Sequence, residues 1–333
     1  MDTALVNWLL DSKDPAVRHA TLITLLGRPL DGPEVRQSRE AMMESAPVRT
    51  ILDRQHPDGY WDRPGGFYNR KYRGTVWQVI FLAQLGADPA DERIRRACEF
   101  LFARSQNRDH GGFVISSNRD HSGGAKGNYP CLTGNLVRAL HHFGYIRDPR
   151  WQHAVDWLLA SQHDDGGWSH GPICGHSCFQ GSIKPLLALT AIAPADRSLG
   201  VEKGIERAVA FLLQHRLFKR DHHGFDVAKR GHLRLRFPLG WQTDVLDLLD
   251  GVTAAGRLDD PRMADALAVV LSKRDSDGRW PLEETFPASG QSSMWCRIET
   301  KGRPSKWVTL RTLRVLERVG QSTAERLALM AEE

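Results

Sequence analysis

Three cysteines have the spacing of a metal site. Cys174 and Cys178 lie close together with His176 between them, and Cys131 opens an earlier apolar segment. Zn²⁺ prefers thiolate and imidazole ligands, and three protein ligands leave a fourth position for water or substrate. We therefore expect zinc as a cofactor, bound by Cys131, Cys174, Cys178 and His176. The alternative is that the cysteines are small apolar residues buried in a tightly packed loop.

An acidic group lies in the segment "DVLDLLD". Asp244, Asp247 and Asp250 follow one another at three-residue steps, which places Asp244 and Asp247 on adjoining faces of a helix. Asp244 begins an apolar segment beside Trp241 and is a candidate general acid or base. Its alternative role is to complement the dipole of the helix in the first turn.

Lysine and aromatic residues lie at the starts of other apolar segments. Aromatic faces can stabilise carbocations, and lysines can hold a diphosphate or a carboxylate. Lys184 lies within an apolar segment, where a charge is costly unless it is paired or faces a wet cavity. For the tryptophans, packing in the core is the alternative. We assign catalytic roles to Lys71 and Tyr72 and substrate binding to Tyr129, Trp241, Lys184, Lys306 and Trp307.

The elements that must position these residues repeat along the chain. A turn with the pattern "Q…DGGW" recurs in five copies. Their aromatic residues are 52 to 57 residues apart, which is room for two helices and their connections. The five aromatics are predicted to pack between neighbouring repeats, at Trp61, Phe113, Trp168, Phe225 and Trp280.

Each copy follows a segment with helical periodicity. Over 94–101, 151–159 and 201–212, apolar residues recur at steps of three and four and leave one charged face. Three such segments open on Asp-Pro, the pattern of a helix cap followed by proline. These caps are predicted at Asp88, Asp148 and Asp260.

After each copy comes a more uniformly apolar helix. Alternating amphipathic and buried helices suggest two concentric rings around a central cavity. The sequence therefore predicts one all-α domain over 1–333, an α/α-toroid that closes with about six inner and six outer helices. The sixth outer helix would be 2–10 or 322–330. An open solenoid is the competing architecture, but such repeats run nearer to about 40 to 47 residues.

The repeated turn resembles the QW-type repeats of squalene and terpene cyclases and of protein prenyltransferase β-subunits, from about Gln55 to Trp307. This resemblance implies an α/α-toroid whose active site lies where the N-terminal ends of the inner helices face the cavity. Prenyltransferase β-subunits hold zinc there with an aspartate, a cysteine and a histidine, whereas this chain offers cysteines. The DxDD acid of squalene-type cyclases and the DDxxD magnesium motif do not occur here.

Two functions remain open. The first is an enzyme of the cyclase or prenyltransferase kind that takes an apolar isoprenoid substrate, such as a prenyl diphosphate, into the cavity. The second is a non-catalytic toroid that binds a lipid or a protein and contains structural zinc. An open fourth position on the metal favours catalysis, and a fourth protein ligand favours structure.

Composition excludes several other classes. The net charge is +5 and the basic residues are scattered, so nucleic-acid binding is not expected. No apolar run approaches the roughly 20 residues of a membrane span. The N-terminus lacks the features of a signal peptide, and five cysteines form no even disulfide framework. We therefore expect a cytoplasmic protein.

Overall fold

The computed structural model describes residues 3–115, 128–171, 175–222, 224–287, 289–290 and 292–332, with side chains up to 320. The predicted all-α fold is confirmed, because helices form most of the described chain. Within these ranges, no helix has the length and apolar character needed to cross a bilayer.

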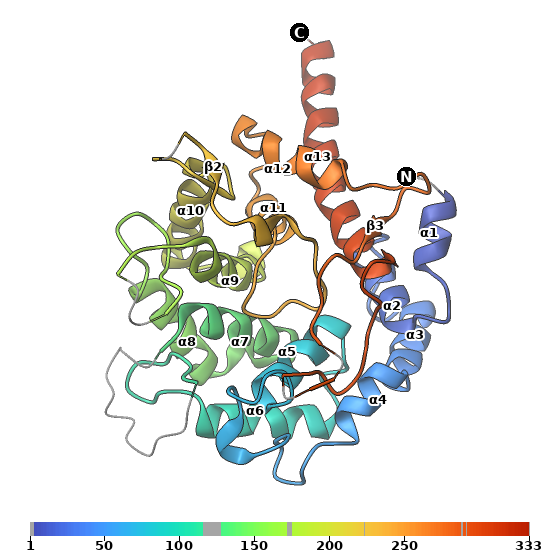
Figure 1. Ribbon diagram of the computed structural model, residues 1–333, viewed down its shortest axis with the longest axis vertical. Coiled ribbons are helices and arrows are strands. Elements are labelled where there is room, and N and C mark those ends of the chain that lie inside the picture. The colour runs from blue at the N-terminus through green and yellow to red at the C-terminus, as the bar shows by residue number, and fades with distance from the viewer. Residues whose placement is uncertain are drawn as a thin grey trace.

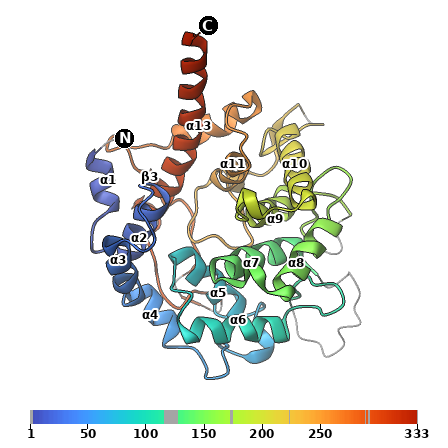
Figure 2. The same cartoon turned by 180° about the vertical axis from the view of Figure 1, so that it is seen from behind.

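Six helices form the inner ring (Figure 1). Each contacts the next in the order α2, α5, α7, α9, α11 and α13, and α13 returns to contact α2. The circuit is therefore closed, and the view from behind shows the same order (Figure 2). The inner helices are α2 (Pro15–Thr24), α5 (Thr75–Leu85), α7 (Pro130–His142), α9 (Phe179–Thr190), α11 (Val245–Ala254) and α13 (Lys306–Glu332).

The other helices cover the inner ring from outside. Each packs against an inner neighbour, and α1 contacts both α13 and α2 where the circuit closes. The sixth outer position is thus taken by α1, whereas 322–330 continues α13, and two short helices, α3 and α4, share the position between α2 and α5. The outer helices are α1 (Thr3–Leu9), α3 (Pro33–Met43), α4 (Ala46–Leu52), α6 (Glu92–Arg104), α8 (Pro149–Ala160), α10 (Leu199–Gln214) and α12 (Ala264–Leu271).

The predicted Asp-Pro caps hold at two of three sites. The side chain of Asp148 accepts from the backbone of Arg150 at the start of α8. Asp260 caps the short 3₁₀ helix that precedes α12. The prediction for Asp88 is wrong, because Asp91 caps α6 instead.

The repeated aromatic fastens an outer helix to the next inner helix. The indole N–H of Trp61 donates to the carbonyl of Ile51 at 2.7 Å, and its backbone N–H donates to the hydroxyl of Thr75 at 3.2 Å. Trp168 and Trp280 repeat both bonds with their own neighbours. All three indoles are buried, so the sequence motif is an architectural joint.

The glutamine and glycine of the turn join neighbouring outer helices. The amide of Gln106 donates to the carbonyls of Gly111 and Arg150, at 2.9 and 2.7 Å. Gly111 has a φ of 80°. A Cβ there would lie 2.3 Å from the carbonyl oxygen of His153. Glycine is therefore required by both the backbone angle and the close approach of α8.

The fourth copy departs from the pattern. Phe225 is only half-buried and lies in a two-stranded hairpin of β1 (Lys219–Arg220) and β2 (Asp226–Val227). A long loop then leads to α11 through the inside of the ring. A second hairpin joins β3 (Trp280–Pro281) to β4 (Pro304–Ser305) ahead of α13.

Candidate functional site

A loop crosses the inside of the ring. We call residues 236–242 the lumenal loop. Its Leu239 pairs with the side chain of Gln84 on α5, and the carbonyl of Gly240 accepts from Asn135 on α7 at 3.1 Å. The carbonyl of Arg236 accepts from Arg311 on α13. Since α7 and α13 are separated by two inner helices in either direction, the loop spans the ring from within.

Aromatic side chains line the loop near the N-terminal end of α5. Tyr72 stacks on Phe286 with ring centroids 3.8 Å apart and meets Trp77 edge to face at 4.9 Å. The hydroxyl oxygen of Tyr72 accepts from the indole of Trp241 at 3.2 Å and from the amide of Gln242 at 3.0 Å. We call Tyr68, Tyr72, Trp77, Trp241 and Phe286 the aromatic rim.

Lys71 extends into the aromatic rim. Its Nζ lies 5.2 Å from the ring centroids of both Tyr68 and Trp241, within the range of cation–π attraction. No carboxylate in the described part of the chain forms an ion pair with it. Burial lowers the pKa of Lys71 from its ordinary value. The ammonium group is thus available to an anion.

Tyr129, His170 and Cys131 lie beside this group. Tyr129 precedes α7 and packs against Gly171, where an added Cβ would lie 2.8 Å from its ring. His170 lies 5.6 Å from the ring of Trp241. The Cys131 thiol donates to the carbonyl of His170 at 3.6 Å, and burial raises the pKa of this thiol to about 12. Cys131 is therefore a neutral thiol in this conformation.

The described ligands of the expected zinc site do not form a complete set. Cys178 caps α9 by accepting from the backbone of Gly181 at 3.3 Å, and the charge of its thiolate acts on the pKa of Cys131. His176 is exposed, and Cys174 lies outside the described residues. Over those residues, no three His, Cys, Asp or Glu side chains gather as a metal site would require.

Asp244 caps α11 and is fully buried. One carboxylate oxygen accepts from the backbone of Asp247 at 2.7 Å, and the other accepts from the backbone of Arg236 at 2.8 Å. Burial raises the pKa of Asp244 above its usual value, against the opposing charge of Arg311. In this conformation both oxygens of the candidate acid are therefore engaged by backbone donors.

Lys184 is paired inside the ring. Its ammonium group donates to Asp247, which also lies 3.4 Å from Arg311 and accepts from the hydroxyl of Thr243 at 3.1 Å. Burial lowers the pKa of Lys184, although Asp247 opposes this. The cost of the buried lysine is offset by this pair, so Lys184 joins α9 to α11 and α13.

Lys306 and Trp307 lie where the ring closes. The ammonium of Lys306 pairs with Asp14 at the start of α2 and lies 3.5 Å from Asp11. Trp307 stacks on Phe237 of the lumenal loop, with ring centroids 4.5 Å apart. Lys306 therefore closes the circuit, and Trp307 anchors one end of the loop.

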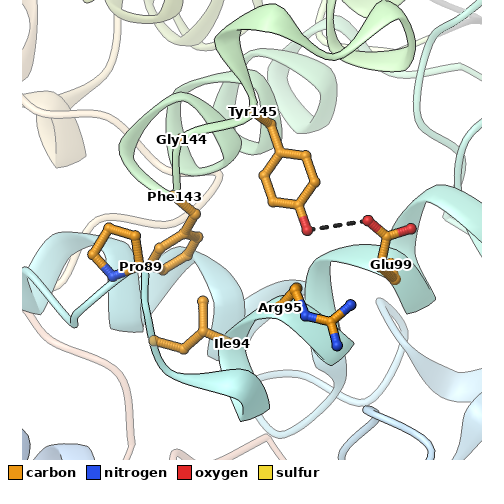
Figure 3. Close-up of a pocket in the computed structure, with 7 residues that line it drawn as sticks. All are labelled: Pro89, Ile94, Arg95, Glu99, Phe143, Gly144 and Tyr145. Atoms are coloured by element: carbon orange, nitrogen blue, oxygen red, sulfur yellow. Dashed lines mark hydrogen bonds between the residues drawn. The ribbon is translucent and has the colours of Figure 1, made fainter.

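A surface pocket lies away from these residues. It has a volume of about 290 Å³ between α6 and the turn that follows α7 (Figure 3). Its Glu99 accepts from the hydroxyl of Tyr145 at 3.1 Å and pairs with Arg150 at 2.7 Å. Its charged groups already have protein partners, and none of the residues selected from the sequence lines it.

Several site residues escaped the sequence analysis. Gln84 and Asn135 hold the lumenal loop, and Phe286 completes the aromatic rim. The available signal for Gln84 was a polar amide in a mostly apolar helix, but Gln78 in the same helix gives the same signal. Phe286 follows the fifth copy of the repeat and has no local pattern that could have identified it.

Comparison with known proteins finds a family model that is similar to part of the chain. Residues 20–183 match the model of the squalene-hopene cyclase C-terminal domain. This span contains the first three copies of the repeated turn and the residues of the site from Tyr68 to Cys178. No curated protein matches the chain.

Solved structures with a similar arrangement have low sequence identity. The apo type II terpene cyclase MstE from Scytonema is 17% identical, with a TM-score of 0.48 over 93% of this chain and 89% of that chain. A variant of MstE in complex with geranylgeranyl dihydroxybenzoate is 18% identical, with a TM-score of 0.46 over 93% and 87%. A protein from Actinoplanes is 16% identical, with a TM-score of 0.45 over 94% and 90%. Residues 20–183 are therefore similar to the squalene-hopene cyclase C-terminal domain, in agreement with the resemblance drawn from the repeated turns.

Proposed function

We propose that this chain is an enzyme of the terpene cyclase or prenyltransferase kind that binds an apolar isoprenoid substrate at the aromatic rim. The observation that supports this most is the position of Lys71. Its ammonium lies between two aromatic faces without a carboxylate partner among the described residues. Such a group can pair with an anionic head group while the neighbouring rings pack against a hydrocarbon chain.

The lumenal loop must move before a long substrate can enter. Trp241 and Phe237 occupy the space between Tyr72 and Trp307, and Gln84 holds the tip of the loop. Loops that close over a site commonly exclude water and then open for exchange. The structure therefore represents the closed form in this proposal.

Movement of the loop would also change the hydrogen bonding of Asp244. The backbone of Arg236 in the loop donates to one oxygen of this carboxylate. A hydrogen bond of this kind favours the ionised form, and its loss leaves a buried carboxyl with a still higher pKa. We assign Asp244 the role of an acid that is released when the loop opens. The proton would go from its carboxyl to a substrate alkene, leaving a carbocation that aromatic faces can stabilise.

Zinc remains part of the proposal. Cys131 and Cys178 begin neighbouring inner helices, and Cys178 helps to raise the pKa of the Cys131 thiol. Cys174 and His176 would have to supply the remaining ligands. Elemental analysis of protein purified without chelator should give about one zinc per chain, and clearly less for Cys131→Ser and Cys178→Ser. A metal content near zero in the unmodified protein would end this part of the proposal.

A non-catalytic toroid is the second candidate. The charged groups of Lys184, Asp247 and Arg311 are paired across the inside of the ring, which is a scaffold-like arrangement. In that case ligands would bind without turnover.

Incubation with farnesyl and geranylgeranyl diphosphate separates the two functions. An enzyme should release a cyclised or transferred product that Asp244→Asn no longer forms, while Lys71→Gln weakens substrate binding. Binding without any product across chain lengths would favour the scaffold. Neither binding nor turnover would contradict the isoprenoid proposal.

A further inference from the structure

Three arginines face one another on the side of the ring toward the C-terminal ends of the inner helices. Asn135 on α7 reaches the lumenal loop, and Arg138 follows three residues later on the same helix face. Arg311 on α13 also reaches the loop, and Arg314 lies one turn beyond it. Arg138 and Arg314 therefore approach the inside of the ring from α7 and α13, which two other inner helices separate in either direction around the circuit.

Asp250 is the carboxylate that they share. It lies on the same face of α11 as Asp247 and pairs with Arg318 at 2.8 Å. Neither Arg138 nor Arg314 forms a hydrogen bond or ion pair with a carboxylate of the described residues. Arg318 thus pairs with Asp250, and Arg138 and Arg314 are left without a direct anionic partner among the described residues.

The electrostatics agree with this crowding. Burial acts to raise the pKa of Asp250, but the charges of Arg314, Arg318 and Arg138 hold it well below its usual range. Burial also lowers the pKa of Arg314. The charges of the neighbouring arginines lower it further, whereas the charge of Asp250 raises it. Half-buried guanidinium groups that lack counter-ions are costly, and an added anion would offset this cost.

We propose that Arg138, Arg314 and Arg318 form a binding site for a phosphate or diphosphate group beneath the lumenal loop. Guanidinium groups present forked donors that match the oxygens of phosphate, and donors from opposite walls can hold two sides of one anion. Arg138 lies about two helical turns along α7 from Cys131, which is beside the aromatic rim, so the site is distinct from Lys71. The anion is either free or the head group of a prenyl diphosphate, and the second case depends on the proposed function.

Calorimetric titration with inorganic diphosphate at constant ionic strength tests the site. Binding by the unmodified protein should weaken by on the order of tenfold or more in Arg138→Gln and in Arg314→Gln, since each loses charge-assisted hydrogen bonds. Arg147→Gln is the matched control, because Arg147 is 85% exposed and pairs with Asp196 on the surface. It should bind as the unmodified protein does.

The melting temperature without anion distinguishes binding from a packing role. At low salt, Arg314→Gln removes a like charge beside Arg318 and should melt no earlier than the unmodified protein. Arg314→Lys keeps the charge but not the fork and should bind with intermediate affinity. If Arg314→Gln fails to fold, the affinities of Arg138→Gln and Arg314→Lys decide the matter.

Two further ligands identify the source of the anion. If geranylgeranyl diphosphate loses affinity in Arg138→Gln, the site holds the head group of the prenyl substrate. If its affinity falls only in Lys71→Gln, the arginines hold free diphosphate. Geranylgeraniol has no phosphate and tests the isoprenoid proposal alone. The anion site is overturned if neither diphosphate compound distinguishes the unmodified protein from the arginine variants.

Discussion

The side-chain amide of Gln84 forms hydrogen bonds with both backbone polar groups of Leu239. Its nitrogen donates to the carbonyl of Leu239 and its oxygen accepts from the backbone N–H, each at 2.7 Å. These two hydrogen bonds imitate the pairing of two strands and fix the tip of the lumenal loop to α5. Gln84 therefore holds the tip of the loop, while Asn135 and Arg311 hold the backbone on either side of it.

Gln84→Ala should loosen the loop without unfolding the ring. The loss of two part-buried hydrogen bonds costs about 1 to 3 kcal/mol locally. Amide hydrogen exchange over 237–242 should become faster, while exchange in α7 and α9 stays unchanged. Gln214→Ala is the control, because Gln214 bonds only to exposed Asp221. Equal exchange in the loop of Gln84→Ala and the unmodified protein would contradict this role.

The turn glycine Gly111 should tolerate alanine poorly. Gly111 and Gly144 have similar φ values, 80° and 86°. An added Cβ at Gly111 meets the carbonyl of His153 at 2.3 Å, whereas at Gly144 it meets nothing within 4 Å. Gly144→Ala should therefore cost about 1 kcal/mol from the backbone angle alone, and Gly111→Ala clearly more. Urea unfolding measures both, and equal losses would refute the close approach.

Replacing either partner of the ion pair inside the ring should lower the free energy of unfolding, but by unequal amounts. Asp247→Asn leaves both Lys184 and Arg311 without their carboxylate, and a broken buried pair of this kind costs about 3 to 5 kcal/mol. Lys184→Met leaves Asp247 with Arg311 and Thr243 and should cost less. Chemical denaturation measures the free energy of unfolding of each variant. A larger loss for Lys184→Met than for Asp247→Asn would overturn this account.

Stability should fall as the pH is lowered from about 6.5 to about 4, in part because of His232. Burial lowers the pKa of His232 to about 4 in the folded protein. Between these values the unfolded chain binds a proton that the native protein does not, so unfolding becomes easier as pH falls. At pH 4 the lowered pKa of His232 reduces the free energy of unfolding by roughly 3 kcal/mol.

His232→Gln should reduce this loss of stability, because it removes the buried imidazole that the unfolded chain protonates. Melting temperatures measured from pH 4 to pH 7 test the difference. Identical profiles for His232→Gln and the unmodified protein would exclude His232 as the cause.

The repeated turn made most of the fold predictable. Glycine, aromatic and glutamine residues recur at a fixed period because each copy makes the same joint between helices, as Trp61 and Trp168 show. The copy at Phe225 was predicted to pack like the others, but it is half-buried. There the chain turns into a hairpin and then enters the ring, which its local sequence does not reveal.

The site was predictable only in part. Lys71, Tyr72 and Trp241 were selected as residues at helix starts, and the structure brings them together. Lys306 was selected as a residue at a helix start and Lys184 as a charge within an apolar helix, but both are paired with carboxylates. Their partners are distant in sequence, so pattern alone could not separate a paired lysine from an available one.

Photo-crosslinking with a benzophenone analogue of geranylgeranyl diphosphate, followed by peptide mapping, tests the central claim most directly. The account predicts labels within 67–77, 128–135 and 237–242, because these segments supply the aromatic rim, Tyr129 and the lumenal loop. Excess geranylgeraniol should compete for these labels. The account would be contradicted by labels confined to the surface pocket that Pro89, Glu99 and Tyr145 line. Labels that geranylgeraniol does not displace would contradict it as well.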